Sequence, residues 1–188
     1  IPDDDAAWDI QEHCQALLAD AGYAQYEISA YARPGRQCAH NLNYWRFGDY
    51  LGIGAGAHGK ISLPAADAGR TAEEAQDRVL RRWKLKHPAA YLLQAGTAAA
   101  IGADTIIPAE QRPFEFMLNV LRLREGFALG HFEARTGLPR TVIDVPLSRA
   151  IDAGWLSREG ARIVPTESGL RFANDVVSLF LTADRAAE

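Results

Sequence analysis

The residues with the clearest potential for chemistry lie in one polar and aromatic segment, His40-Asn41-Leu42-Asn43-Tyr44-Trp45. Haem iron accepts a neutral imidazole as ligand, and large aromatic rings stack on a porphyrin. His40 beside Tyr44 and Trp45 therefore favours a planar macrocycle, with His40 as the candidate iron ligand. The alternative, which is more common for a single histidine, is a hydrogen-bonded or solvent-facing imidazole without a ligand.

A second candidate is the glycine-rich segment 52–60. It contains Gly54-x-Gly56-x-x-Gly59, which matches the dinucleotide fingerprint, and Gly59-Lys60 ends a near-match to a P-loop. Both motifs need a helix directly after the glycines, whereas residues 60–63 predict a strand, and Ile61 stands where a P-loop needs Ser or Thr. We expect no nucleotide site. The glycines indicate either close approach of a strand to a bulky ligand or a plain structural strand.

Other kinds of site find little support in the 188 residues. The chain has no Gly-x-Ser-x-Gly and no His-Glu-x-x-His motif, its five histidines lack metal-ligand spacing, and two cysteines alone cannot hold zinc or an iron–sulfur cluster. No stretch approaches the roughly 20 apolar residues of a membrane span. Residues 109–188 carry ten arginines, no lysine and eleven acidic residues, so we expect no nucleic-acid partner.

The elements that would position these residues begin with a helix over residues 3–22, capped by Asp3 to Asp5. Its apolar stripe of Ile10, Cys14, Leu17, Leu18 and Ala21 predicts a packing role for Cys14. Residues 26–32 predict a strand, ended by Pro34-Gly35. A helix followed by a strand is typical of an α/β layer.

The remaining chain divides at a weakly patterned stretch, residues 96–108, which we interpret as a linker between a domain at 1–95 and one at 109–188. Before it we expect a solvated loop over 64–77 and a short helix from Pro88 to Leu93. After it we expect three helical segments, a β-hairpin over 155–164 and a final helix from about Glu167. This pattern favours a small helical, winged-helix-like domain.

Five segments together resemble the HemW family of radical S-adenosylmethionine (SAM) haem chaperones, which is related to the oxygen-independent coproporphyrinogen III oxidases. These segments are residues 26–35, 40–45, 48–59, 112–119 and 121–126. The resemblance extends from the first helix to Phe180. It implies an α/β fold made of the last strands and helices of a partial (β/α) barrel, followed by the HemN C-terminal-like domain.

The resemblance also implies roles for particular residues. The family's haem-linked motif falls on His40, Asn41, Tyr44 and Trp45, with His40 as the iron ligand. The glycine-rich strand corresponds to a late barrel strand beside the SAM site, with the contact near Ala57 and His58. Members are cytosolic or loosely associated with the membrane, and they deliver haem to respiratory haem proteins.

One departure from the family pattern limits these expectations. The family holds a [4Fe–4S] cluster with Cys-x-x-x-Cys-x-x-Cys, whereas Cys14 and Cys38 match no part of that motif. Since Ile1 is not a start methionine either, we interpret the chain as the C-terminal half of such a protein. It would bind haem but perform no radical chemistry without the cluster-binding half, and its open sheet edge predicts self-association or a rearranged strand order. The alternatives are the same half of a coproporphyrinogen III oxidase, and a structural or interaction module.

Overall fold

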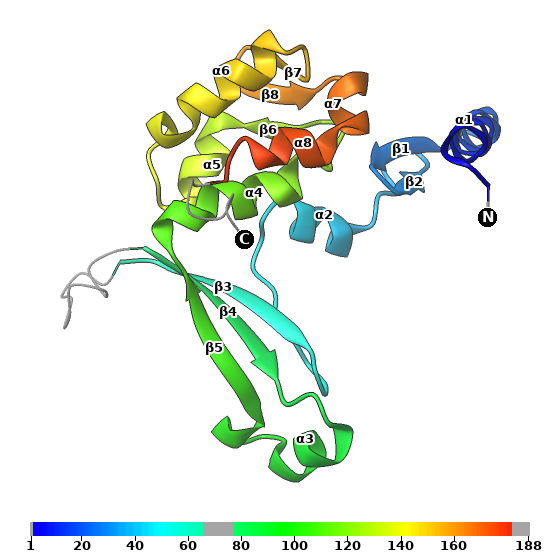
Figure 1. Cartoon of the computed structure of the whole chain (residues 1–188). Coiled ribbons are helices and arrows are strands. Elements are labelled where there is room, and N and C mark those ends of the chain that lie inside the picture. The colour runs from blue at the N-terminus through cyan, green and yellow to red at the C-terminus, as the bar shows by residue number, and fades with distance from the viewer. Residues whose placement is uncertain (1, 66–76, 182–188) are drawn as a thin grey trace.

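The N-terminal region places the His40 segment on a short helix of its own. The computed structural model describes residues 2–65 and 77–181 (Figure 1). Helix α1 (Asp4–Asp20) is followed by the antiparallel hairpin of β1 (Ala24–Glu27) and β2 (Ala30–Ala32), and then by α2 (Ala39–Trp45). Asp3 caps α1, since its side chain accepts a hydrogen bond from the Ala6 amide, as the sequence predicts.

The middle of the chain is an antiparallel sheet in the order β3-β4-β5. It consists of β3 (His58–Leu63), β4 (Arg78–Lys84) and β5 (Ile101–Ile107), with α3 (Pro88–Gln94) and a short 3-10 turn, η1 (Ala98–Ala100), between the last two strands. Figure 1 shows this sheet extending from the C-terminal helices, with α3 at its far end. The predicted strand after the glycines and the predicted helix from Pro88 are both confirmed.

The C-terminal region surrounds a second three-stranded antiparallel sheet, in the order β6-β8-β7. Its strands are β6 (Phe127–Ala128), β7 (Leu156–Glu159) and β8 (Arg162–Pro165). The helices around them are α4 (Arg112–Val120), α5 (Leu129–Thr136), α6 (Asp144–Asp152), α7 (Glu167–Arg171) and α8 (Ala173–Ser178), with the 3-10 turns η2 (Ala109–Gln111) and η3 (Arg140–Ile143). The predicted hairpin is therefore confirmed, and the winged-helix arrangement stays a prediction.

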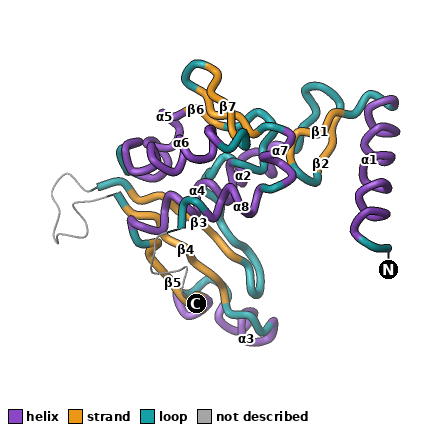
Figure 2. The backbone as a smooth tube through the Cα atoms, turned by 45° about the horizontal axis from the view of Figure 1, so that its top comes forward, coloured by secondary structure: helices purple, strands orange, loops and turns teal. Residues whose placement is uncertain are grey.

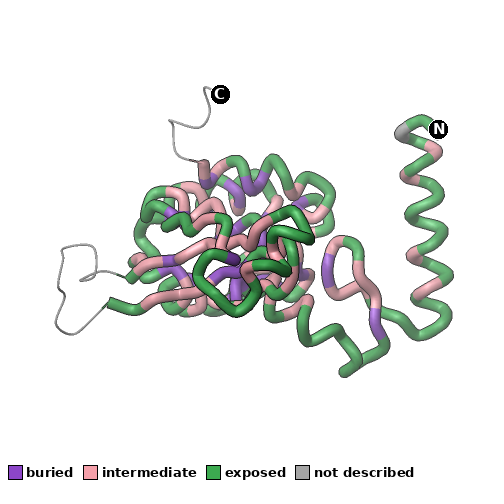
Figure 3. Tube along the Cα trace, turned by 90° about the horizontal axis from the view of Figure 1, so that it is seen from below, coloured by how far each residue is buried: buried purple, intermediate pink, exposed green. Residues whose placement is uncertain are grey.

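Most of the hydrophobic core lies in this C-terminal region (Figure 3). Phe116, Phe132 and Ile143 are fully buried there. Phe47, Val79 and Ile107 join the same core from the loop after α2 and from strands β4 and β5. Because burial of such side chains is the main stabilising term, the core holds α2 and the β3-β4-β5 sheet to the C-terminal helices.

The expectation that the apolar stripe of α1 is buried is wrong for its main members. Ile10 and Leu17 are 57% and 56% exposed, and Cys14 is exposed. Figures 2 and 3 show α1 standing apart from the main body. The helix reaches the C-terminal region through Trp8, whose ring lies 4.0 Å from Cζ of Arg171. Within the described ranges, Ile10, Cys14 and Leu17 stay exposed, whereas Leu18 is half-buried.

The single strand expected over residues 26–32 is a hairpin in the structure. Ile28 and Ser29 form its turn: the Ile28 amide donates to the Arg122 carbonyl, and the Ser29 amide and hydroxyl donate to the Glu27 carboxylate. The final helix expected from Glu167 is likewise two helices, because Phe172 leaves the helical conformation between α7 and α8. The break at Ile28 depends on a partner far along the chain, which local periodicity does not reveal.

The stretch 96–108, expected as a linker, contains strand β5. This strand pairs with β4, with Val79 opposite Ile107 at one end and Lys84 opposite Ile101 at the other. Strand pairing with a distant partner explains why its own pattern is weak. The domain boundaries at 95 and 109 stay a prediction. Most of the expected loop at 64–77 lies outside the described residues.

The fold is mixed α/β, but its strands depart from those of a (β/α) barrel, which are parallel. Every strand pairing in the described ranges is antiparallel. Antiparallel strands can follow each other through short connections, as β1 and β2 do, whereas parallel strands require a crossover. The parallel strands of a (β/α) barrel are therefore not found among these residues, and a partial barrel in a longer protein stays a prediction.

Candidate functional site

Helix α2 is anchored at its C-terminal end by Phe47. This side chain is 1% exposed and packs edge-on against Phe116, with ring centroids 5.6 Å apart. Phe47 has a φ of 53°, a left-handed conformation that is unusual for a residue with a side chain. The sharp turn it makes sends the chain from α2 toward β3, so the predicted haem segment is fixed to the C-terminal core at one end.

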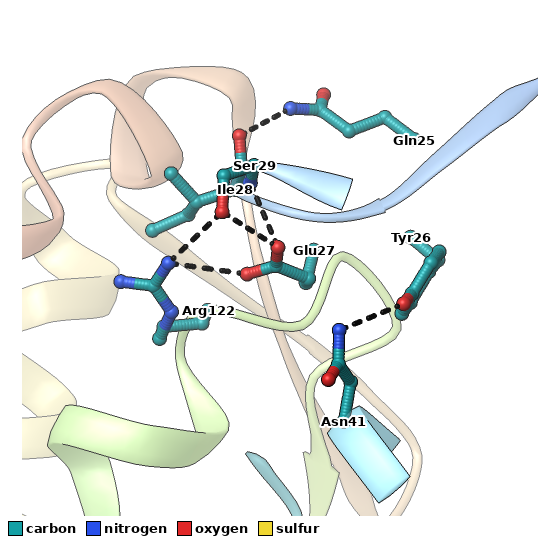
Figure 4. A network of polar contacts seen from close by, with 7 residues as sticks. All are labelled: Gln25, Tyr26, Glu27, Ile28, Ser29, Asn41 and Arg122. Atoms are coloured by element: carbon teal, nitrogen blue, oxygen red, sulfur yellow. Dashed lines mark hydrogen bonds and ion pairs between the residues drawn. The ribbon is translucent and has the colours of Figure 1, made fainter. Parts of the chain in front are cut away.

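Helix α2 carries all four residues of the predicted haem segment. His40 is exposed in the first turn, and Tyr44 follows four residues later on the same face. The ring of Tyr44 lies 4.9 Å from that of Trp45, edge to face. Asn41 faces the hairpin instead, where its amide donates to the Tyr26 hydroxyl at 3.3 Å (Figure 4). The structure thus brings an exposed imidazole and an aromatic cluster together, with Asn41 as a tether.

A third aromatic ring, Tyr50, extends this cluster toward the sheet. Its centroid lies 4.9 Å from that of Tyr44. Burial, together with the neighbouring Tyr44, raises the pKa of Tyr50 to about 12. The phenol therefore stays protonated at neutral pH and contributes ring surface, not an anionic ligand.

Trp45 contacts Arg122, which is paired with Glu27, and the sequence indicated neither of these two residues. Cζ of Arg122 lies 4.4 Å from the centroid of the Trp45 ring, and Nη2 of Arg122 lies 3.2 Å from Oε2 of the buried Glu27. Figure 4 shows this ion pair between the hairpin and the segment after α4. Glu27 and Arg122 are 95 residues apart, so no local motif could have paired them.

Lys60, the lysine of the near P-loop match, points into the protein. Its Nζ lies 3.0 Å from Oδ1 of Asp49, and its side chain is 3% exposed. Burial lowers the pKa of Lys60, and the hydrogen bond to Asp49 counters this effect. Strand β3 follows the glycines where a phosphate site would need a helix. The absence of a nucleotide site here stays a prediction.

The glycines of this segment are explained in part by backbone packing. A Cβ on Gly52 would lie 2.4 Å from the His58 carbonyl oxygen, so only glycine fits there. Gly54 has a φ of 109°, which favours glycine as well. Both glycines lie in the loop before β3 rather than in the expected strand, and backbone packing and conformation account for them.

Ala57 and His58, the predicted SAM contacts, lie at the start of β3. The Ala57 carbonyl accepts a hydrogen bond from the Lys84 amide, and the exposed His58 ring lies 6.1 Å from that of Trp83. A groove of about 220 Å³ adjoins Ala57. Its lining consists of Leu51, Gly52, Ile53, Ala57, Gly59, Ile61, Arg82 and Lys84. No hydrogen bond or ring contact within ranges 2–65 and 77–181 joins Ala57 or His58 to α2.

The cysteines do not form a cluster site. Cys14 lies on α1 and Cys38 precedes α2, and both thiols are exposed. A [4Fe–4S] cluster is held by several cysteine thiolates, so these two residues do not fit one. None of the helices in the described part of the chain is long and apolar enough to cross a membrane.

Comparison with known proteins connects this geometry to a family. Residues 107–172 match the HemN C-terminal domain. The chain is 44% identical over 181 residues to heme chaperone HemW of Escherichia coli, and 42% identical over 184 residues to that of Haemophilus influenzae. These alignments cover 96% and 98% of the chain, and 44% of each relative. Over nearly its whole length, this chain is similar to part of heme chaperone HemW.

The similarity extends to more distant HemW proteins. HemW of Mycobacterium tuberculosis is 35% identical over 182 residues, which is 96% of the chain and 40% of that relative. The chain thus spans less than half the length of the curated HemW proteins it matches. The predicted resemblance to HemW is confirmed, and part of the chain also matches the HemN C-terminal domain.

A solved structure shows the same fold. The Escherichia coli coproporphyrinogen III oxidase HemN, described as a radical SAM enzyme, superposes with a TM-score of 0.62. The match covers 96% of this chain and 42% of HemN at 15% sequence identity. The likeness therefore supports a HemN-like α/β fold.

Proposed function

We propose that this chain is the haem-binding part of a HemW-type haem chaperone and passes haem to client haem proteins. The observation that carries the proposal is the exposed His40 on α2, one helical turn from Tyr44 and beside the aromatic cluster. Close relatives over nearly the whole chain carry the name heme chaperone HemW. The haem here is cargo, so its site must allow both binding and release.

In this proposal each residue of α2 has a separate task. His40 offers a neutral imidazole nitrogen to the iron, and Tyr44 and Trp45 provide ring surface for the porphyrin. Asn41 holds the helix to the hairpin through Tyr26. Because the His40 imidazole is exposed and makes no hydrogen bond to the described residues, binding iron would not require breaking a side-chain contact. An exposed single ligand also suits a carrier that gives up its cargo.

The SAM molecule and the [4Fe–4S] cluster belong, in this proposal, to the full-length protein. Ala57 and His58 would border the SAM, beside the groove at the start of β3. The cluster ligands would come from an N-terminal half of the barrel, which is also the expected partner of this segment. The residues described above provide no ligand set for the cluster, so we assign them no radical step.

The remaining expectations about partners and place in the cell stay predictions. We expect the protein to be cytoplasmic, with peripheral attachment to the membrane as the alternative. We also expect it to have no nucleic-acid partner and to associate with itself. The formal charge of −4 supports the absence of a nucleic-acid partner.

A haem titration tests the proposal. Purified chain is titrated with haem, and the Soret band is recorded for wild type, His40→Ala and the control His13→Ala. His13 is also exposed and helical, but it lies on α1. We expect His40→Ala to shift the Soret band and weaken binding, and His13→Ala to behave as wild type. Equal spectra for all three proteins would exclude His40 as the ligand.

The second candidate function is that of a coproporphyrinogen III oxidase, and the structural likeness to HemN supports it. The full-length protein, supplied with SAM and a reductant, would then convert coproporphyrinogen III to product. Lack of product together with haem binding would favour the chaperone. If the chain binds no haem but restores function when mixed with the N-terminal half, it is a structural module instead.

A further inference from the structure

The guanidinium of Arg122 lies between an aromatic ring and a buried carboxylate. On one side its Cζ is 4.4 Å from the centroid of the Trp45 ring. On the other side its Nη2 donates to Oε2 of Glu27 at 3.2 Å. Glu27 is 2% exposed, and a buried carboxylate needs such a partner. The ion pair therefore holds the guanidinium group that lies over the Trp45 ring.

Glu27 is itself held in place by the turn of the hairpin. Its Oε1 accepts hydrogen bonds from the amide and hydroxyl of Ser29, at 3.0 and 2.8 Å. Figure 4 shows these contacts converging on the carboxylate, with Arg122 on its other oxygen. The carboxylate thus has both oxygens occupied and little freedom to move.

The backbone of Arg122 is clamped to the same hairpin. The Ile28 amide donates to the Arg122 carbonyl at 3.1 Å, and the Arg124 amide donates to the Tyr26 carbonyl at 3.1 Å. Glu27 and Leu123 form an antiparallel bridge. Both ends of the Arg122 side chain are therefore fixed, which makes it a rigid support for the ring that it contacts.

The Trp45 side chain is fixed by fewer polar contacts than the Arg122 side chain. Its Nε1 is buried and has no hydrogen-bond partner among the described residues. The ring makes an edge contact with Tyr44, and the guanidinium of Arg122 lies over it. Because Arg122 covers one face of the indole, a macrocycle can stack only on the opposite face.

We propose that Arg122 is a positioning residue for haem, which sets the orientation of the Trp45 ring with Glu27 as its counter-charge. This inference rests on the proposed haem-binding function. It means that the segment after α4 determines the geometry of the aromatic wall on α2. The chain's C-terminal region then acts on the haem site without touching the haem.

The first experiment records the fluorine signal of the Trp45 ring in the absence of haem. The chain is labelled with 5-fluorotryptophan, and Trp45→Phe assigns its signal among the four tryptophans. The variants are Arg122→Met, which keeps the length of the side chain, and the matched control Arg124→Met, whose guanidinium contacts Gln25 and Glu167. We expect Arg122→Met to shift or broaden the Trp45 fluorine signal and Arg124→Met to leave it unchanged.

A haem titration of the same proteins follows. We expect Arg122→Met to weaken haem binding about 3- to 30-fold, the range that cation–π stacking supports, and Arg124→Met to bind as wild type. If Arg122→Met does not fold, Arg122→Lys carries the test, because it keeps the charge and loses the planar stack.

An unchanged Trp45 signal in the Arg122 variant would overturn the proposal. So would a shifted signal with unchanged haem affinity in a chain that binds haem. If wild type binds no haem, the proposed function fails, and with it the haem role of Arg122. The fluorine spectra then report separately whether Arg122 orients the ring.

Discussion

The ammonium group of Lys60 lies 4.1 Å from the centroid of the Phe47 ring. Phe47 follows the helix that carries the predicted haem segment, and Lys60 belongs to the strand after the glycines. Asp49, between them in sequence, pairs with the same ammonium at 3.0 Å and accepts hydrogen bonds from the amide and hydroxyl of Ser62. The two segments that the sequence singled out are therefore joined by one buried cation.

Removal of the charge on Asp49 tests this connection. Burial raises the pKa of Asp49, but hydrogen bonds from Ser62 and Lys60 outweigh it and hold the pKa below its usual value. Asp49→Asn leaves the buried Lys60 without a counter-charge. We expect the free energy of unfolding to fall by about 1–3 kcal/mol, measured by urea denaturation.

The control for this prediction is Asp104→Asn. Asp104 pairs with Arg82 at 2.6 Å, but both side chains are substantially exposed. Exposed ion pairs contribute little to stability, so this variant should unfold close to wild type. Equal losses in the two variants would mean that the burial of Lys60 does not matter.

Stability should also depend on the protonation of His131. Its Nε2 lies 2.7 Å from the Arg46 carbonyl oxygen, at the end of α2. Burial lowers the pKa of His131 below the unfolded value of about 6.5, and nearby arginines lower it further. The unfolded chain therefore binds more protons in this range, and stability falls as the pH drops through about 6.5. Urea denaturation from about pH 8 to pH 5.5 should show this loss, with a shallower slope in His131→Gln.

Substitution of two glycines with positive φ distinguishes the cost of a steric contact from the cost of backbone strain. Gly126 has a φ of 60°, and a Cβ there would lie 1.9 Å from the Ile163 carbonyl oxygen of β8. Gly154 has a φ of 73° with open space around it. We expect Gly154→Ala to cost about 1–2 kcal/mol from strain. Gly126→Ala should cost at least about 2 kcal/mol more, since β8 must move. Similar losses in thermal unfolding would refute the contact argument.

The sequence predicted much of this structure where the determining contacts are local. Pro88 starts α3, Asp3 caps α1, and the residues between Gly154 and Pro165 form the expected hairpin. Each of these elements follows from the conformational preferences of a few neighbouring residues. The motif on α2 was likewise visible, because its residues lie within one short helix.

The rest depends on partners far along the chain. Strand β5 pairs with β4 and has little pattern of its own, and the turn at Ile28 is fixed by Arg122. The stacking of Arg122 on Trp45 was missed for the same reason. The stripe on α1 shows the opposite error, since an apolar pattern indicates a buried face but does not say which element covers it.

That uncovered stripe leads to a prediction about Cys14. Ile10 and Leu17 are more than half exposed on the same helix, and exposed apolar side chains at this spacing favour association. We expect Cys14 to react readily with a thiol reagent in dilute solution and more slowly as the protein concentration rises. Cys38, exposed before α2, is the internal control and should react at a constant rate. Cys14→Ser and Cys38→Ser assign the two phases. Equal, concentration-independent rates and a monodisperse monomer in light scattering would show that the stripe does not drive self-association.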